Sequence, residues 1–434
     1  MPVADLKTIN DTVHGTMRLD PLVLDLLETL ELQRLGSIRQ LGLTYLVFPG
    51  ANHSRIEHCL GVGHVAGEIG TAVEVPAEER KLLVAAGLLH DLGHGPFSHT
   101  LEHVLSARLK RDHMDVTMDL ITGRAEGGDT ETRTALGEVP RVPEILEKHD
   151  LDPKAVAALI KGGGEKSGGL TVHRGQAHFS AKRYLAQTIH GAVDADQIDY
   201  LLRDSHYTGV ALGMIDSRRL LQTFAVHNGQ LAIQRKGVPA LEGMLTARAL
   251  MYSSVYFHKT VRIAEQMLSR AVERSEGDIA ALQGMVDSEL VRWLTDQGGF
   301  SREIALRLKF RKLYKRVWVR GRYELDDQQR EALAALADPG ARAEAEARIA
   351  KRAGCRPGGV IVDIPLPELL ISEPRIARTD VPVLDGGRVT PLRKASPLAR
   401  ALQLRDVSDW VVMVAARPEE RTSVARHVER VLFP

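Results

Sequence analysis

Apolar residues recur at helical spacing through most of the first 315 residues, and this pattern limits the fold more than any other feature of the sequence. Between Pro21 and Leu41, a leucine or isoleucine returns every three to five residues, as in an amphipathic helix. The same pattern predicts helices at residues 55–72, 77–92, 96–109, 113–122, 142–160, 179–205, 216–228, 238–274, 276–296 and 300–314. The sequence therefore predicts a mostly α-helical fold.

The pattern changes after about residue 315. There, "RVWVRGRYEL", "VIVDIP" and "DWVVMVAA" are short β-branched runs separated by Pro and Gly, which is typical of strands. We expect a helical core over residues 1–315 and a small C-terminal α+β region over residues 316–434. Two Gly-rich, charged segments near residues 123–140 and 161–170 are expected to be insertions in the core.

Composition narrows the classes of function. The 434 residues carry a formal net charge of +1, so any contact with phosphate or nucleic acid must come from local clusters. Cys59 and Cys355 are the only cysteines, too few for a disulfide framework or a thiolate zinc site. The sequence has neither a signal-peptide pattern nor an apolar run of bilayer length. We expect a cytoplasmic protein with no membrane partner, in which a metal would be bound by His and carboxylate groups.

The stretch "AAGLLHDLGHGPFSHTLEH", residues 85–103, concentrates such groups directly after an apolar run. Successive residues in a regular helix point about 100° apart, so His90 and Asp91 can bind one ion only near a helix end. Gly93 and Pro96 predict that end. A divalent transition metal favours such nitrogen and oxygen ligands. For any single histidine, a structural or surface role remains the alternative.

Two remote segments carry the groups that would complete such a site. In "FPGANHSRIEHCLGVGHVAG", Arg55 and His58 are three residues apart on one helix face. In "GAVDADQIDYLLRDSHYTG", residues 191–209, Asp196, Tyr200 and Asp204 follow one another at intervals of four. The alternative for the second segment is an amphipathic helix with a packed apolar face and solvated acidic residues.

These segments, together with "SSVYFHKTV", resemble the HD-domain deoxynucleoside triphosphate triphosphohydrolases in order and spacing. The resemblance covers most of residues 6–320 and includes four ordered motifs. It implies an HD-domain helical core and the reaction of a dNTP with water to give deoxynucleoside and inorganic triphosphate.

The resemblance also implies the roles of individual residues. His58, His90, Asp91 and Asp196 match the family's ligands for a divalent transition metal such as Mn, Fe, Ni, Co or Zn, and Mg can accompany the nucleotide. His94 and His113 match proton-transfer positions, with Glu102 in place of the family's Asp. The implied substrate-binding residues are Arg55, His99, Arg248 and Tyr256 for the triphosphate, Tyr200 beneath the sugar, and Gln40 and Asp204 for the 3′-hydroxyl.

Other positions qualify the resemblance. Gln197 replaces a lysine that contacts the triphosphate, and Met114 replaces a glutamate beside His113. The resemblance extends to positions that bind activator nucleotides between subunits, although Gly36 replaces an arginine there and Glu28 an aspartate. The matching activator positions are Lys7, Asn10 and Gln33 at a guanine-nucleotide site and Arg219, Arg235, Lys259, Arg311 and Lys315 at a basic second site. We expect a homo-oligomer, a tetramer or a dimer.

Two alternatives stay open. An HD phosphohydrolase for another nucleotide phosphate ester, such as a nucleoside monophosphate, a ribonucleotide or an alarmone, would account for Gln197. A nucleic-acid-binding regulatory module could use the basic run from Arg302 to Arg322, which is otherwise a solvated basic face.

Overall fold

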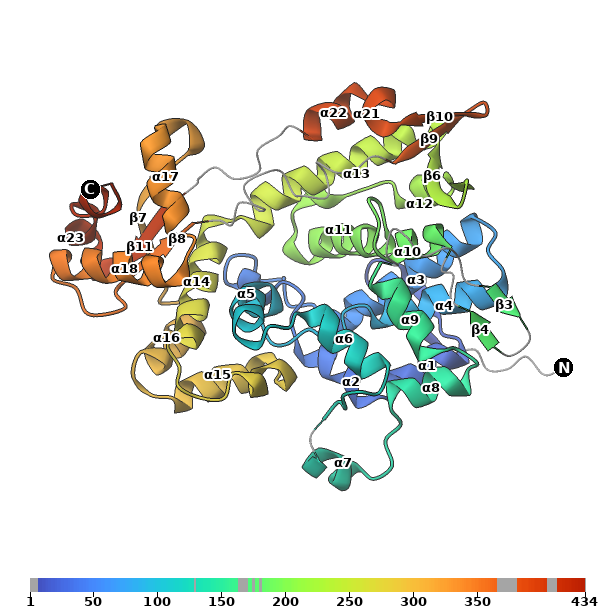
Figure 1. The fold of residues 1–434 in the computed structure, drawn as a ribbon, viewed down its shortest axis with the longest axis horizontal. Helices are drawn as coiled ribbons and strands as arrows, with labels where there is room; N and C mark the ends of the chain where they lie inside the picture. Colours follow the sequence, from blue (N-terminus) through green and yellow to red (C-terminus); the bar gives the residue numbers. More distant parts are fainter. Residues whose placement is uncertain are drawn as a thin grey trace.

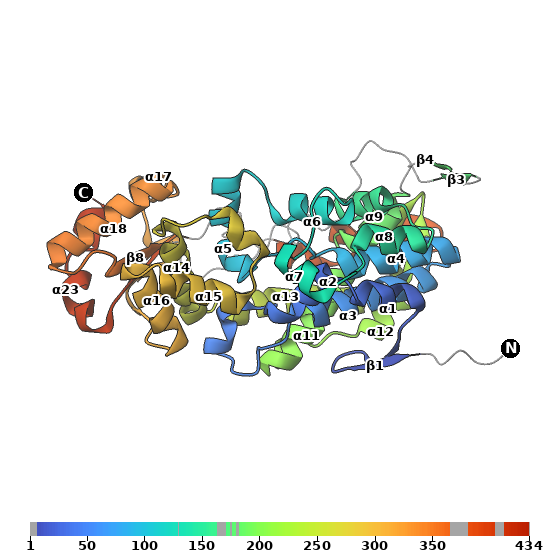
Figure 2. The same cartoon turned by 90° about the horizontal axis from the view of Figure 1, so that it is seen from below.

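The structure is a computed structural model, and it describes residues 7–128, 130–162, 171–173, 176–178, 182–364, 381–403 and 412–433. Helices dominate, which confirms the predicted fold class. Figures 1 and 2 show an elongated molecule, with the C-terminal sheet at one end and most of the early helices toward the other. Of the insertion predicted at 161–170, only residues 161 and 162 lie within the described part.

The helical core is formed by short and medium helices joined by tight turns. Its helices are α1 (Pro21–Leu27), α2 (Leu30–Arg34), α3 (Arg55–Ala72), α4 (Ala77–Leu89), α5 (Ser98–Leu109), α6 (His113–Ile121), α7 (Thr130–Leu136), α8 (Val142–Lys148), α9 (Pro153–Ile160), α10 (Arg183–Ile189), α11 (Ala195–Thr208), α12 (Ser217–Leu221), α13 (Val238–Met251), α14 (Lys259–Glu273), α15 (Asp287–Asp296) and α16 (Gly299–Lys309). A π-helical turn, Tyr252–Tyr256, connects α13 to α14.

Helices α3 and α4 cross with their backbones in contact, and glycines make this approach feasible. A Cβ atom on Gly87 would lie 2.9 Å from the carbonyl oxygen of Val62 and 3.0 Å from the Cα of Gly63. Around this crossing, the apolar residues of α3, α4, α9, α10 and α11 form one buried cluster. The crossing fixes the start of α3 and the end of α4 relative to each other, and both of these helix ends carry candidate site residues.

Within the described ranges, the strands form four small sheets. Two hairpins, β1 (Thr8–Asp11) with β2 (Gly15–Arg18) and β3 (Thr171–His173) with β4 (Gln176–His178), are antiparallel pairs. The larger sheets have the orders β10-β9-β6-β5 and β7-β11-β8. Their strands are β5 (Phe224–His227), β6 (Gln230–Gln234), β7 (Lys315–Arg320), β8 (Val360–Asp363), β9 (Pro382–Asp385), β10 (Arg388–Pro391) and β11 (Val412–Ala416).

The residues after 315, predicted as one region, divide between two places. The first part carries β7, α17 (Asp327–Ala335), α18 (Pro339–Ala353) and β8, and it is joined by β11, α23 (Arg421–Ala425) and α24 (Glu429–Leu432). The intervening β9, β10, α21 (Leu392–Ala395) and α22 (Pro397–Gln403) return to the core, where β9 pairs in parallel with β6 and α22 packs on α13. Figure 1 shows the red α21–α22 segment beside α13, away from β11.

Several predicted helices differ from the structure. The helix predicted at 216–228 is wrong in its second half, where α12 ends at Leu221 and β5 begins at Phe224. The helix predicted at 142–160 is broken between α8 and α9, because Asp152 caps a new helix that begins with Pro153. The hairpin β1–β2 was not predicted.

The segment predicted as an insertion at 123–140 contacts the core and contains α7. Glu31 is buried, and its carboxylate accepts hydrogen bonds from the Gly127 amide (3.0 Å) and from Arg133 (3.1 Å). No helix in the described ranges combines the length and apolar character needed to cross a membrane.

Candidate active site

The candidate site forms where the start of α3, the end of α4 and the first half of α11 meet. Helix α3 begins with a capping box in which Glu57 accepts a hydrogen bond from the Ser54 amide (2.6 Å). Helix α11 is capped by Asp194, which accepts from the Gln197 amide (2.9 Å). Helix α4 ends at Leu89, three residues before the predicted end at 92, so His90 and Asp91 lie at its C-terminal end. These caps fix which side chains of each helix reach the site.

His58, His90 and Asp196 form a group that can hold a metal ion. Each offers a ligand atom, and these three atoms all lie within 4.8 Å of one another. His58 Nε2 lies 3.2 Å from Asp196 Oδ1, and His90 Nε2 lies 3.9 Å from the same oxygen. Two imidazoles and one carboxylate suit a divalent transition metal. Three of the four predicted ligands are thus brought together.

Asp91, the fourth predicted ligand, lies at the border of this group. Its Oδ1 lies 3.2 Å from His90 Nε2, while its Oδ2 accepts a hydrogen bond from Arg55. Arg55 is buried, and its second terminal nitrogen lies 3.4 Å from His99 Nε2. Arg55 therefore links the carboxylate of Asp91 to the imidazole of His99.

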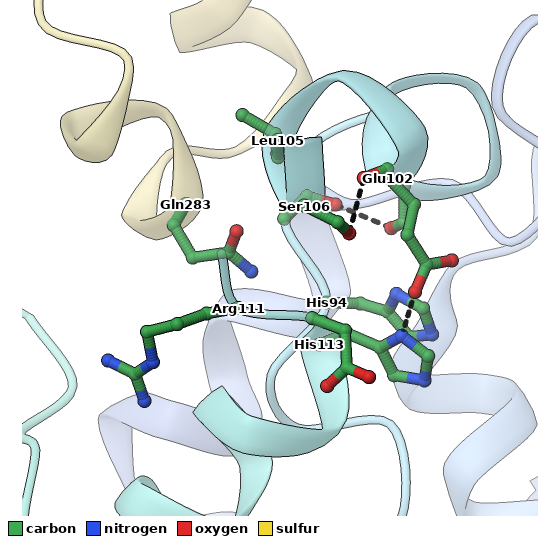
Figure 3. A pocket seen from close by; sticks show the side chains of 10 residues that line it. His94, Glu102, Leu105, Ser106, Arg111, His113 and Gln283 are labelled. Atoms are coloured by element: carbon green, nitrogen blue, oxygen red, sulfur yellow. Dashed lines mark hydrogen bonds and ion pairs between the residues drawn. The ribbon is translucent and has the colours of Figure 1, made fainter. Parts of the chain in front are cut away.

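Beside the metal group, His94, His113 and Glu102 line a small cavity (Figure 3). The rings of His94 and His113 stack with centroids 4.0 Å apart, and His113 Nδ1 forms an ion pair with Glu102 Oε1. His94 Nε2 lies 3.4 Å from Asp91 Oδ1, so the stacked pair is continuous with the metal group. The stacking depends on Gly93, whose added Cβ would lie 2.2 Å from the carbonyl oxygen of His113.

The pKa values of the two stacked imidazoles are shifted in opposite directions. Burial, reinforced by the charge of Arg55, lowers the pKa of His94 to about 3. Burial also opposes protonation of His113, but the hydrogen bond and the charge of Glu102 outweigh it and raise the pKa of His113. Despite its own burial, Glu102 has its pKa lowered to about 2 by the same pair. The site therefore holds one neutral and one readily protonated imidazole in contact.

Asp204 lies at the centre of a second polar group. Its Oδ2 accepts a hydrogen bond from the Tyr256 hydroxyl (2.6 Å), and its Oδ1 lies 2.9 Å from His53 Nε2. The rings of Tyr256 and Tyr200 meet edge to face with centroids 6.2 Å apart. Gln40 is buried, and among the described residues its Oε1 has no hydrogen-bond partner. Asp204 and Tyr256, two of the residues matched to sugar and phosphate recognition, therefore orient each other.

Arg248 and Gln197 form a buried pair. Both side chains are 0% exposed, and Arg248 donates a hydrogen bond from Nη1 to Gln197 Oε1 (2.6 Å). Gln197 also donates from Nε2 to the Gly191 carbonyl (3.2 Å). The glutamine that replaces the family's lysine therefore orients the arginine expected to contact phosphate.

The predicted activator residues lie on exposed positions of several elements. Gln33 on α2 donates to the Leu27 carbonyl (2.6 Å), and Lys7 and Asn10 belong to the segment that forms β1. Arg219 and Arg235 donate to the carbonyls of Lys236 (3.4 Å) and Ala395 (3.1 Å), respectively. The other three lie at the start of α14, after α16 and at the start of β7, namely Lys259, Arg311 and Lys315. Arg235 follows β6 and Lys315 begins β7, and these strands lie at opposite ends of the molecule (Figure 1), so one chain does not bring the five basic residues together.

Four further residues support the site but were not identified from the sequence. Asp199 lies 2.8 Å from His58 Nδ1, and His14 contacts Asp199 from the N-terminal hairpin. Arg34 donates to the carbonyls of Leu92 (3.0 Å) and His94 (2.7 Å), and His53 contacts Asp204. Only Asp199 left a sequence signal, since it follows Asp196 by three residues on a helix that already carried a candidate ligand.

Comparison with known proteins identifies the family. Residues 55–204 match the HD domain, and residues 215–433 match the HD associated region. An uncharacterized protein of Methanocaldococcus jannaschii is 32% identical over 435 residues, covering 97% of this chain and 81% of that protein. The chain therefore belongs to the HD-domain phosphohydrolase superfamily, with the HD-associated region that follows its HD domain.

Two further comparisons are informative. The deoxynucleoside triphosphate triphosphohydrolase SAMHD1 of Gallus gallus is 30% identical over 353 residues, which cover 71% of this chain and 56% of that protein. The chain thus spans little more than half the length of this relative. The crystal structure of a hypothetical protein from Aquifex aeolicus aligns with a TM-score of 0.71 at 27% identity, covering 98% of this chain and 100% of that chain.

Proposed function

We propose that this HD phosphohydrolase hydrolyses dNTPs to deoxynucleoside and inorganic triphosphate. The observation that carries the proposal is the continuous series of contacts from the metal group through Asp91 to the His94–His113 pair. This series supports the proposal, because hydrolysis of a phosphate ester requires a metal, a phosphate-binding arginine and a proton donor around one substrate.

The donor set fits a divalent transition metal, held by His58, His90 and Asp196 with Asp91 beside them. His58 Nδ1 faces the carboxylate of Asp199, which leaves Nε2 for the ion. Mn, Fe, Ni, Co and Zn all suit these ligands, and Mg can accompany the nucleotide. When bound, the ion would polarise the α-phosphate and lower the pKa of water.

The residues of the chain would do the remaining work. Arg55 is a buried cation beside the metal group, and Arg248 is a buried cation beside Gln197. Both can neutralise charge on the triphosphate. Water attacks the α-phosphorus, the bond to the 5′-oxygen breaks, and a proton passes to that oxygen. His113, held by Glu102, would donate the proton. His94 and His99, whose pKa values are lowered by burial and by the charge of Arg55, would contact phosphate oxygens.

The sugar contacts favour a deoxynucleotide. Asp204, fixed by Tyr256 and His53, and the Oε1 of the buried Gln40, which accepts no hydrogen bond from the described part of the chain, offer acceptors for a 3′-hydroxyl. Tyr200 would lie against C2′, where its ring would disfavour a 2′-hydroxyl. The name of the chicken relative agrees with this substrate class.

Product analysis tests the proposal. Manganese-loaded protein is incubated with each of the four dNTPs, and products are separated and detected by phosphorus. Triphosphate with deoxynucleoside is the expected result, and Asp196→Ala is expected to abolish turnover while the helical content is retained. Monophosphate with pyrophosphate, or full turnover in Asp196→Ala, would contradict the assignment.

One observation favours a second candidate, an HD phosphohydrolase for another nucleotide phosphate ester. Gln197 uses its oxygen to bind Arg248, so this position supplies no second cation for a triphosphate. A substrate with fewer phosphates would need less positive charge. Turnover of monophosphates, ribonucleotides or alarmones in preference to dNTPs would support this candidate.

We further propose that the protein is a homo-oligomer, a tetramer or a dimer, activated by nucleotides. The exposure of Lys7, Asn10 and Gln33 and of the five basic residues at the second predicted site supports this proposal. The test adds GTP or a second dNTP to the turnover assay. Light scattering records the mass before and after addition. An increase in both rate and mass is expected.

A further inference from the structure

His58 makes two different contacts with its two ring nitrogens. Nε2 faces Asp196 in the metal group, at 3.2 Å, and Nδ1 lies 2.8 Å from Asp199 Oδ2. A carboxylate only accepts hydrogen bonds, so this contact favours the proton on Nδ1 and leaves the Nε2 lone pair for a metal. Asp199 thereby sets the tautomer and the ring orientation of His58.

Asp199 is itself held by residues from outside the metal group. Its side chain is 0% exposed, and Arg203 donates to it from Nε and Nη2, both at 2.9 Å. Its Oδ1 also lies 2.6 Å from His14 Nε2. A buried carboxylate is stable only when such partners surround it. The position of Asp199 therefore depends on Arg203 and His14 together.

The hairpin of β1 and β2 contacts Asp199 through His14 and contacts Arg203 through Asp11. Asp11 closes the turn by accepting from the amides of Val13 and His14, both at 2.8 Å. The other oxygen of Asp11 accepts from Arg203 Nη1 (2.8 Å). An isolated two-stranded hairpin is marginally stable in water, so its position depends on contacts of this kind.

Space for this network is provided by Gly61 on α3. A Cβ atom there would lie 1.8 Å from Asp199 Oδ1 and 2.5 Å from Arg203 Nη2. A side chain at this position would displace both groups. The helix that carries His58 is thus shaped to accept the Asp199–Arg203 pair.

From these contacts we propose that Asp199 is a positioning residue of the metal centre and that the N-terminal hairpin, through His14 and Asp11, completes its surroundings. Metal binding and hairpin docking then stabilise each other, because each favours the same orientation of His58 and Asp199. This inference rests on the metal assignment in the proposed function, but it does not depend on which nucleotide is hydrolysed.

The first experiment measures manganese affinity by competition with a chelator of known affinity, without nucleotide. His14→Leu removes the contact to Asp199, and we expect it to weaken manganese binding by about 10-fold. This is the lower end of the range for direct partners of metal ligands, because His14 acts on His58 through Asp199. His14→Gln keeps a donor near the position of Nε2 and should bind manganese nearly as well as the wild type. Equal affinities in the Leu and wild-type proteins would overturn the proposal.

Thr12→Val is the matched control. Thr12 lies in the same turn, and its hydroxyl contacts Tyr207 (3.3 Å) rather than Asp199. Wild-type affinity is expected in this variant, so that weakened binding in His14→Leu reports the Asp199 contact and not general loosening of the turn. Equal weakening in Thr12→Val would contradict the proposed route.

A second measurement follows the hairpin itself. Hydrogen exchange of residues 8–18 should slow when manganese is added to the wild type, and it should not respond in Asp196→Ala. Exchange that is indifferent to manganese in a wild type that binds the ion would overturn the proposed coupling. Manganese-dependent protection without dNTP turnover would support the coupling and contradict only the proposed reaction.

Discussion

At the scale of single residues, one ion pair distinguishes two neighbouring histidines. His94 and His113 stack, but their surroundings differ: His113 forms an ion pair with Glu102, whereas His94 is buried near Arg55, with its Nε2 3.4 Å from Asp91 Oδ1. Burial lowers the pKa of His94, whereas the pair with Glu102 raises the pKa of His113. Environments that separate the pKa values of adjacent groups are the usual sign of an acid and its neutral neighbour.

Replacing Glu102 with Gln tests this assignment. A raised pKa keeps His113 protonated to higher pH, so activity that needs its proton falls as pH rises through that pKa. Loss of the carboxylate lowers the pKa, and the alkaline limb of the pH profile of kcat/KM should move to lower pH. An unmoved limb would exclude His113 as the donor. His113→Gln should remove the limb and most of the rate.

The hydroxyl of Tyr256 permits a second test at this scale. Tyr256→Phe removes the hydrogen bond that holds Asp204 in place, so the carboxylate should contact the 3′-hydroxyl less well. The preference for a dNTP over its 2′,3′-dideoxy analogue should then shrink by about 10-fold in kcat/KM, the worth of one hydrogen bond. Tyr314→Phe is the control, because its hydroxyl contacts the Gly358 carbonyl in the C-terminal part. An unchanged preference in Tyr256→Phe would contradict 3′-hydroxyl recognition by Asp204.

The residues that sequence could indicate were those with a chemical signature at helical spacing. His58, His90 and Asp196 were predicted in this way, and the structure brings their ligand atoms together. Asp199 looked equally like a solvated acid on an amphipathic helix, and the structure buries it completely. His14 was not identified because its role arises only when a hairpin 185 residues away in sequence packs against α11.

At the scale of elements, the crossing of α3 and α4 fixes the distance between the helix that carries His58 and the helix end that carries His90. Gly87→Ala should destabilise the fold by about 1–3 kcal/mol, because the new methyl group meets the backbone of α3. Gly243→Ala is the control, because that glycine is exposed on α13 and no atom lies within 4 Å of the added Cβ. Alanine is the better helix residue, so this replacement should raise the free energy of unfolding by about 0.5–1 kcal/mol. Thermal or denaturant unfolding measures both; stable Gly87→Ala protein would contradict the close contact.

The elements also show where periodicity is informative. The helix at 55–72 was predicted from its apolar spacing with the bounds of α3, and the structure adds a capping box at its start. The prediction at 216–228 was wrong beyond Leu221, because a five-residue helix and a four-residue strand are each too short to show a period. The hairpin β1–β2 was not predicted for the same reason, since each of its strands has four residues.

At the level of the whole chain, the C-terminal residues divide between the helical core and a separate small α+β unit. The strand β9 and helix α22 pack on the core, while β7, β8 and β11 with α18 form the far end. Sequence indicated strands after residue 315 but not this division, because the pairing of β6 with β9 joins residues about 150 positions apart. The far end is attached to α14 by a buried arginine, Arg270.

Arg270→Leu should loosen this attachment. Arg270 donates to Glu346 on α18 (2.9 Å) and to the Val362 carbonyl (3.3 Å), so its loss weakens the pairing of a buried carboxylate and should cost about 3–5 kcal/mol. Limited proteolysis should then cleave the C-terminal part first. Arg292→Ala, which removes an exposed ion pair with Asp296, should leave the proteolytic pattern unchanged. Identical resistance of Arg270→Leu would refute the attachment.

Hydrolysis of a dNTP in ¹⁸O-labelled water is the decisive test of attack at the α-phosphorus. In the proposed reaction, water would attack the α-phosphorus beside His58, His90 and Asp196 while His113 protonates the departing 5′-oxygen. One ¹⁸O atom should therefore appear in the inorganic triphosphate, and the deoxynucleoside should carry none. Label in the deoxynucleoside, or in a monophosphate released with pyrophosphate, would contradict the account.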